Sequence, residues 1–121
     1  MKTVLVADDE PTLLSLIAEL LADEGYDVVT ARDGREALEL ASRRAPDLIL
    51  LDVMMPRLDG REALRLMRDR PELREVPVAM MSAGIREDQV PPGVALLPKP
   101  FDLDRLLALV ARLVEPDTEA G

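Results

Sequence analysis

The chain has 121 residues, a net charge of −9, and neither cysteine nor histidine. This length predicts one domain, and the acidic balance argues against direct nucleic-acid binding, which needs a basic footprint. Without cysteine there is no disulfide or thiolate metal site, which fits a reducing compartment such as the cytoplasm, and without histidine there is no imidazole base. No apolar stretch approaches the roughly 20 residues of a membrane-spanning helix, so no membrane contact is expected.

The first half of the chain alternates short apolar runs with amphipathic segments. Strands are predicted at 3–7, 26–31 and 48–52. A helix is expected from Pro11 to near Gly25 and a second one after Asp33-Gly34. Because the last of these runs, Leu48-Ile49-Leu50-Leu51, is continuously apolar, it predicts a strand that is buried on both faces, as in a parallel sheet.

The second half continues the alternation, with one weak link. A helix at 61–70, strands at 76–81 and 94–97, and a last helix capped by Asp102 are predicted. Between those strands only about one turn, 86–90, can be helical, since Pro91-Pro92-Gly93 follows. Residues 1–115 are therefore expected to form one domain, and residues 116–121 a polar tail or the beginning of a linker.

Alternating strands and helices predict a single flavodoxin-like, doubly wound α/β domain. Its parallel sheet has five strands in the order 2-1-3-4-5, and the fourth crossover helix is short or missing. One internal echo is present, since Asp33-Gly-Arg-Glu-Ala-Leu and Asp59-Gly-Arg-Glu-Ala-Leu share a pattern. Two copies are too few for a solenoid, so we interpret them as one turn-into-helix solution used twice.

Polar side chains follow most of the predicted strands. Asp8 and Asp9 come after the first strand, Asp52 ends the third, Ser82 follows the fourth and Lys99 follows the fifth. Because the carboxyl ends of parallel strands share one edge, these side chains are expected to converge. Three carboxylates together are unfavourable without a cation, and oxygen ligands with water favour Mg²⁺.

This set suits phosphoryl transfer onto a protein carboxylate. Asp52 can act as the nucleophile, while Mg²⁺ and Lys99 offset charge on the phosphoryl oxygens and Ser82 offers a hydroxyl donor. The added charge could switch a bistable neighbour. Each residue also has a plainer explanation. Asp8 could be no more than the N-cap of the next helix, and Asp9 could complement only its dipole. Asp52 could cap a loop, Ser82 could be a turn residue, and Lys99 could be a solvated charge. Their joint placement at strand ends favours the site.

The chain resembles the response-regulator receiver domains of two-component signalling, in the manner of the chemotaxis receiver, over residues 2–115. The resemblance is carried by Val-Leu-Val-Ala-Asp8-Asp9-Glu, Leu-Ile-Leu-Leu-Asp52-Val-Met-Met-Pro56, Val-Ala-Met-Met-Ser82-Ala and Lys99-Pro100-Phe101. It implies that Asp52 accepts a phosphoryl group from a sensor histidine kinase or a phosphotransfer protein. The protein would then be a phosphoprotein and signal-transduction switch, with no enzymatic activity beyond its own phosphorylation and slow hydrolysis.

The resemblance also implies a role for each residue around Asp52. Mg²⁺ would be bound by the side chains of Asp9 and Asp52, by Asp8 through water, and by the backbone carbonyl of Met54. The phosphoryl group would be bound by Ser82, Lys99 and the Ala83 amide, and the Lys99–Pro100 bond would be cis. Phosphorylation would change binding to an unidentified downstream protein, and the domain would be a monomer or weak dimer.

The chain departs from the family pattern in three respects. Leu96 replaces the aromatic residue that normally works with Ser82 as the switch, and segment 83–93 is shorter than usual, which truncates the output face. Met54 and Gly84 occupy the two variable positions beside the pocket, and neither side chain can orient a hydrolytic water. We therefore expect slow self-dephosphorylation and an output that does not use a ring movement.

Other functions remain open at this point. A receiver-shaped adaptor that works without phosphorylation would explain the altered output face. An aspartyl phosphatase of the haloacid dehalogenase type also uses a strand-end Asp, Mg²⁺ and a Lys, but such enzymes need a second Asp where this chain has Met54. A flavodoxin is disfavoured because the first loop is acidic where a phosphate cradle is needed.

Overall fold

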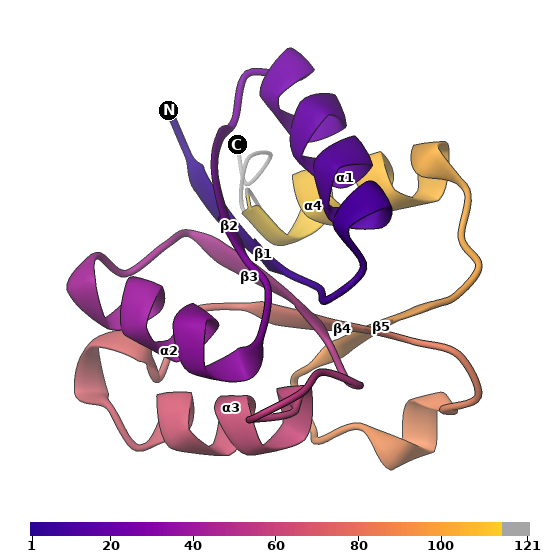
Figure 1. Cartoon of the computed structure of the whole chain (residues 1–121). Coiled ribbons are helices and arrows are strands. Elements are labelled where there is room, and N and C mark those ends of the chain that lie inside the picture. The colour runs from indigo at the N-terminus through magenta and orange to yellow at the C-terminus, as the bar shows by residue number, and fades with distance from the viewer. Residues whose placement is uncertain (115–121) are drawn as a thin grey trace, which may run out of the picture.

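The computed structural model describes residues 1–114, apart from the side chain of Glu87. Five parallel strands form one sheet in the order β2-β1-β3-β4-β5 (Figure 1). This confirms the doubly wound sheet predicted from the sequence. The strands are β1 (Thr3–Ala7), β2 (Asp27–Ala31), β3 (Leu48–Asp52), β4 (Val78–Ser82) and β5 (Ala95–Pro98).

Helices cover both faces of the sheet, with α1 and α4 on one face and α2 and α3 on the other (Figure 1). As predicted, the connection between β4 and β5 contains only a single 3₁₀ turn, η2, within the described part of the chain. No helix among residues 1–114 is long and apolar enough to cross a membrane. The helices are α1 (Pro11–Asp23), α2 (Gly34–Arg43), α3 (Gly60–Arg68) and α4 (Leu103–Val114), with 3₁₀ turns η1 (Pro71–Leu73) and η2 (Glu87–Gln89).

Element boundaries differ from the predictions by one or two residues at several ends. One of the two-residue differences is at β4, which begins at Val78 rather than at residue 76. The Val76 N–H donates to the Leu73 carbonyl and so completes the preceding turn, and Pro77 has no N–H to offer the sheet. The predicted tail, residues 116–121, lies outside the described residues, as does residue 115.

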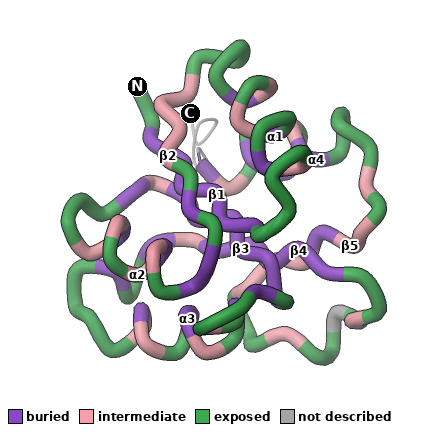
Figure 2. The backbone as a smooth tube through the Cα atoms, in the orientation of Figure 1, coloured by how far each residue is buried: buried purple, intermediate pink, exposed green. Residues whose placement is uncertain are grey.

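Strand β3 is the centre of the core. Leu48 and Leu50 belong to the core on the side of α1 and α4, whereas Ile49 and Leu51 belong to the core on the side of α2 and α3, and all four residues are fully buried. Figure 2 shows β3 as a buried strand in the middle of the molecule. Because both faces are covered by helices, the strand needs apolar residues at every position, which explains the continuous run. Asp52 is the last residue of this buried strand and therefore lies at the carboxyl edge of the sheet.

The repeated Asp-Gly pattern is the same helix start used twice. Asp33 and Asp59 are the N-caps of α2 and α3, and their carboxylates accept hydrogen bonds from the N–H groups of Glu36 and Glu62. This satisfies backbone donors that the first helical turn leaves open. The interpretation of the echo as a repeated turn is confirmed.

The glycine after each cap is needed for close backbone approach. A Cβ on Gly34 would lie 1.9 Å from the carbonyl oxygen of Leu58, and one on Gly60 would lie 2.3 Å from the carbonyl oxygen of Asp52. Both distances are far inside van der Waals contact, so only glycine fits. The start of α3 is therefore packed directly against the end of β3, beside the candidate site.

Candidate functional site

The structure brings three carboxylates together at the carboxyl edge of the sheet. Asp8 and Asp9 follow β1, and Asp52 ends the neighbouring strand β3, where Ala7 is paired with Leu51. One oxygen from each carboxylate lies within 4.8 Å of the others. This is the switch point of the strand order, the position at which open α/β sheets form their sites.

The three carboxylates have different surroundings. Asp8 is fully buried and Asp52 is 4% exposed, whereas Asp9 is exposed to solvent. Asp8 accepts a hydrogen bond from the Glu10 N–H at 2.9 Å and one from the Lys99 ammonium at 3.0 Å. The N-cap of α1 is Glu10, which makes no side-chain capping bond. Helix capping therefore does not explain the presence of Asp8.

Lys99 is the positive group of the site. Its Nζ lies 3.0 Å from Asp8 Oδ2 and 3.5 Å from Asp52 Oδ2. The Lys99 N–H donates to the Ser82 carbonyl, and the bond to Pro100 is cis, as the resemblance implies. Burial lowers the pKa of Lys99, but the hydrogen bond and charge of Asp8, together with Asp52, outweigh burial and raise it. The ammonium group therefore stays charged.

The charge of the site remains unbalanced on the acidic side. Burial and the charge of Asp8 raise the pKa of Asp52 to about 6, although Lys99 and the Met54 N–H act in the opposite direction. Every candidate ligand is an oxygen, and the Asp9 carboxylate is open to solvent. Three carboxylates with one ammonium therefore fit a hard divalent cation such as Mg²⁺, with water completing its coordination.

The remaining predicted residues lie around this cluster. Ser82 is buried at the end of β4, and its hydroxyl donates to the Ala83 carbonyl at 3.2 Å rather than to a carboxylate. The Met54 N–H donates to Asp52 Oδ1 at 3.4 Å, while its side chain is 73% exposed. Gly84 has a left-handed backbone with φ +81° and no atoms near a notional Cβ. Positions 54 and 84 therefore both have room for a side chain beside the carboxylate cluster.

Leu96 lies outside the carboxylate cluster. It sits half-buried on the outermost strand, β5, where it is paired with Met80. It lines a hollow together with Arg105 and Arg112 of α4. The structure therefore places the expected switch position at the edge of the sheet, away from Asp52.

Sequence reasoning missed an ion pair next to the site. Arg57, in the loop after β3, donates through Nη2 and Nε to Asp33 Oδ2 at 2.6 and 3.0 Å. Its backbone is left-handed, with φ 63°, which is rare for a residue with a side chain. The hydrogen bond from the Glu36 N–H, followed by Arg57, lowers the pKa of Asp33. The loop after Asp52 is thus tied to the start of α2.

The raised pKa of Asp52 predicts a pH-dependent stability. The folded-state pKa of Asp52, about 6, lies above the reference value of 3.8. The folded state therefore favours the protonated carboxyl group, and the stability that this group contributes is complete below about pH 4. This contribution is lost as the pH rises through about 6. At neutral pH in EDTA, Asp52→Asn is expected to raise the free energy of unfolding by roughly 1–3 kcal/mol. Urea unfolding measures this difference.

The same pair of proteins in Mg²⁺ supplies the control. Only the wild type is expected to gain stability from the ion, because binding to the folded state stabilises it by mass action. Equal stability of the two proteins in EDTA at neutral pH would contradict the assigned electrostatics.

Comparison with known proteins identifies the family of this chain and agrees with its fold. The family model of the response regulator receiver domain matches residues 4–111. The chain therefore belongs to the response regulator receiver domain family, whose members typically bind Mg²⁺ at an acidic pocket and take phosphoryl groups from histidine kinases.

Relatives include full regulators that are longer than this chain. Response regulator MprA of Mycolicibacterium vanbaalenii is 40% identical over 129 residues, covering 98% of this chain and 54% of the relative. The alkaline phosphatase synthesis transcriptional regulatory protein PhoP of Bacillus subtilis is 41% identical over 105 residues, covering 83% of this chain and 43% of the relative. The chain thus spans about half the length of these curated relatives or less.

Solved structures share the whole fold. The chemotaxis response regulator CheY4 of Vibrio cholerae superposes with a TM-score of 0.87 at 31% identity, covering 93% of this chain and 98% of that chain. The receiver domain of the Francisella response regulator 1452 gives a TM-score of 0.87 at 33% identity, covering 96% and 98%. The short connection between β4 and β5 therefore leaves the overall architecture of the family intact.

Proposed function

We propose that this chain is a phosphorylatable receiver that accepts a phosphoryl group on Asp52 and thereby changes its binding to a downstream protein. The observation that carries this proposal is the buried Asp52 carboxylate, held 3.5 Å from the Lys99 ammonium and within one cluster with Asp8 and Asp9. The donor is a sensor histidine kinase or a phosphotransfer protein. A buried nucleophile at a strand end, with a fixed positive group beside it, suits phosphoryl transfer.

The transfer is a substitution at phosphorus. An oxygen of Asp52 forms the new P–O bond while the P–N bond of the phosphohistidine donor breaks, and the electron pair returns to the imidazole. Lys99 then pairs with a phosphoryl oxygen, and the Ser82 hydroxyl turns from the Ala83 carbonyl to donate to another, beside the Ala83 amide. Mg²⁺, held by Asp9, Asp52, the Met54 carbonyl and Asp8 through water, would offset charge on the phosphoryl oxygens.

The route from Asp52 to the partner differs from the usual one. Leu96 cannot act as a rotating aromatic ring, and one 3₁₀ turn stands where a crossover helix is usual, so we place the response in Ser82 and segment 83–93. The alignment with MprA spans 129 positions, whereas this chain has 121 residues. The relative therefore has residues at positions where this chain has a gap. The cytoplasmic location, the binding of an unidentified downstream protein, and the monomeric or weakly dimeric state remain predictions.

Beryllofluoride, which mimics an acyl phosphate, tests the proposal without a cognate kinase. With Mg²⁺ present it is expected to bind stoichiometrically and to shift the amide resonances of Ala83 and Lys99, and Asp52→Asn should abolish the shifts. Saturable shifts that persist in Asp52→Asn would contradict the proposal. Turnover of p-nitrophenyl phosphate by the wild type would support the aspartyl phosphatase instead, and absence of both responses would support the phosphorylation-independent adaptor.

Slow self-dephosphorylation is the expected consequence of the two variable positions. Met54 is apolar and points into solvent, and Gly84 has no side chain, so neither positions a water for in-line attack on the phosphorus. The double substitution Met54→Asn with Gly84→Glu is expected to accelerate decay of the phosphorylated protein roughly tenfold or more. Decay is followed by intact-mass spectrometry in Mg²⁺, with Gly93→Glu as a control distant from the pocket. An unchanged decay rate would refute the explanation.

A further inference from the structure

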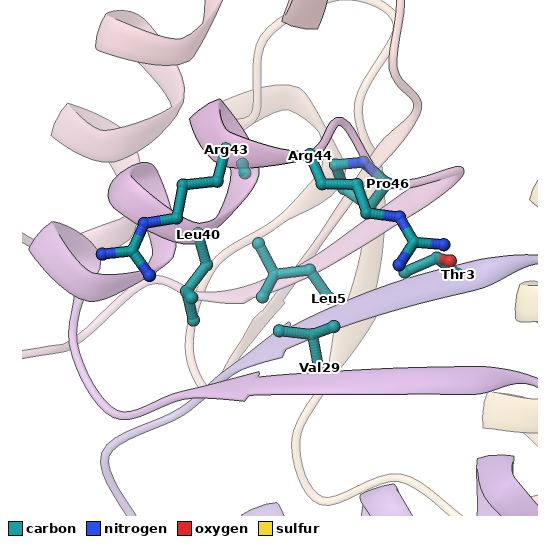
Figure 3. Close-up of a pocket in the computed structure, with 8 residues that line it drawn as sticks. Thr3, Leu5, Val29, Leu40, Arg43, Arg44 and Pro46 are labelled. Carbon is teal, nitrogen blue, oxygen red and sulfur yellow. The ribbon is translucent and has the colours of Figure 1, made fainter.

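A cavity lies between α2 and the sheet, away from the carboxyl ends of the strands at which Asp52 lies. It has a volume of about 150 Å³ and is enclosed by the start of β1, the middle of β2 and the last turn of α2. Its floor is apolar, formed mainly by Leu5, Val29 and Leu40, while Thr3 and Pro46 close one side (Figure 3). An apolar cavity of about this size accommodates one six-carbon hydrocarbon group.

Two arginines flank the cavity and have no partner within the part of the chain that the structure describes. Among the described residues, the guanidinium groups of Arg43 and Arg44 form no hydrogen bond or ion pair. A basic residue at the end of a helix can serve only the helix dipole, which would account for Arg43. The same interaction is open to Arg44, the C-cap residue of α2, whose backbone is extended with φ −153°. The helix dipole does not, however, explain the apolar hollow that the two side chains border. Two unpaired cations therefore border an apolar hollow.

The orientation of the arginines determines the kind of ligand. Figure 3 shows the two side chains reaching to opposite sides of Leu40, Leu5 and Val29. A small molecule with one carboxylate could meet only one of them at a time. A protein segment with an apolar side chain between two acidic residues could fill the cavity and pair with both guanidinium groups.

The charge distribution of the chain favours the same ligand. Ten of the 15 basic residues lie between positions 32 and 75, where they balance ten acidic residues. All of the net charge of −9 therefore lies outside this segment. Another hollow beside α2 shares Arg43 and adds Arg35 and Arg70, together with one acidic residue, Glu39. An acidic partner would be repelled by the rest of the molecule and directed toward α2.

We propose that this cavity, which we call the α2 cavity, is a docking site for an acidic protein segment that inserts one apolar side chain between Arg43 and Arg44. The site is remote from the carboxylate cluster, so a partner there leaves Asp52 open to a phosphoryl donor. This inference does not depend on phosphorylation, and its test uses the unphosphorylated protein in EDTA.

The probe is the synthetic peptide acetyl-Glu-Glu-Leu-Glu-Glu-amide, titrated into methyl-labelled protein and followed by NMR. Saturable shifts are expected at the methyl groups of Leu5, Val29 and Leu40. The peptide with Ala in place of Leu should bind roughly tenfold more weakly, because it leaves the cavity unfilled. Arg43→Gln and Arg44→Gln should each weaken binding roughly two- to fivefold, whereas the exposed Arg61→Gln on α3 should not.

Four results would overturn the proposal. One is the absence of saturable shifts at these methyl groups, and another is equal binding by a peptide with Lys in place of every Glu. Equal saturation by hexanoate would assign the cavity to small carboxylates instead of a protein segment. The same methyl shifts on raising protein concentration without peptide would assign it to a second copy of the chain.

Discussion

The Asp9→Asn variant is expected to bind Mg²⁺ at least about tenfold more weakly than the wild type, without loss of folding stability. Asp9 is the solvent-exposed member of the carboxylate cluster, whereas Asp8 and Asp52 are buried and each is paired with Lys99. Neutralising Asp9 therefore removes a metal ligand without leaving a buried charge unpaired. Isothermal titration calorimetry measures the affinity, and urea unfolding in EDTA measures the stability.

The adjacent Glu10 offers a matched control. It is equally exposed and acidic, but it does not belong to the carboxylate cluster. Glu10→Gln is expected to leave Mg²⁺ affinity within about twofold of the wild type, since an exposed carboxylate that does not bind the ion interacts with it only weakly through water. Equal weakening by the two substitutions would mean that the ion responds only to overall charge, and the assigned site would be wrong.

Gly60→Ala is expected to lower the free energy of unfolding by about 3 kcal/mol or more. Its new Cβ would lie 2.3 Å from the Asp52 carbonyl oxygen and 2.9 Å from the Val53 Cα, and both are backbone atoms that no side-chain rotation can move. Relief requires the start of α3 to shift away from the end of β3. Mg²⁺ affinity should therefore fall together with stability, because Asp52 moves with its backbone.

Gly25→Ala separates this packing effect from the general cost of replacing glycine. Gly25 has φ +96°, but nothing lies within 4 Å of the position of a Cβ. Its substitution is expected to cost about 1 kcal/mol from backbone strain alone, with unchanged Mg²⁺ affinity. If Gly60→Ala were no more destabilising than Gly25→Ala, the close contact between α3 and β3 would be disproved.

The parts of the fold that could be predicted from the sequence are those that depend on short runs of neighbouring residues. The run of Leu48 to Leu51 predicted a strand buried on both faces, and a strand of the parallel sheet requires just such a run. The proximity of Asp8, Asp9 and Asp52 could be predicted from the sequence because the carboxyl ends of parallel strands lie at one edge of the sheet. The missing crossover helix was visible in Pro91-Pro92-Gly93, and η2 confirms it.

Other features depend on contacts between distant segments. The Arg57–Asp33 ion pair joins residues 24 positions apart, and the sequence explained Asp33 only as part of the turn that leads into α2. The start of β4 depended on whether Val76 completed a turn or joined the sheet, which its N–H bond to Leu73 decides. The α2 cavity arises from packing between β1, β2 and α2, for which the sequence carries no periodic signal.

The proposed role of Asp52 as a Mg²⁺-dependent phosphoacceptor is tested most directly by intact-mass spectrometry after incubation with acetyl phosphate. The predicted result is an increase equal to one phosphoryl group per chain in Mg²⁺. The increase should be absent in EDTA and in Asp52→Asn, whose folding is checked by unfolding in the same buffer. No increase in the wild type, or the same increase in the variant, would contradict the account.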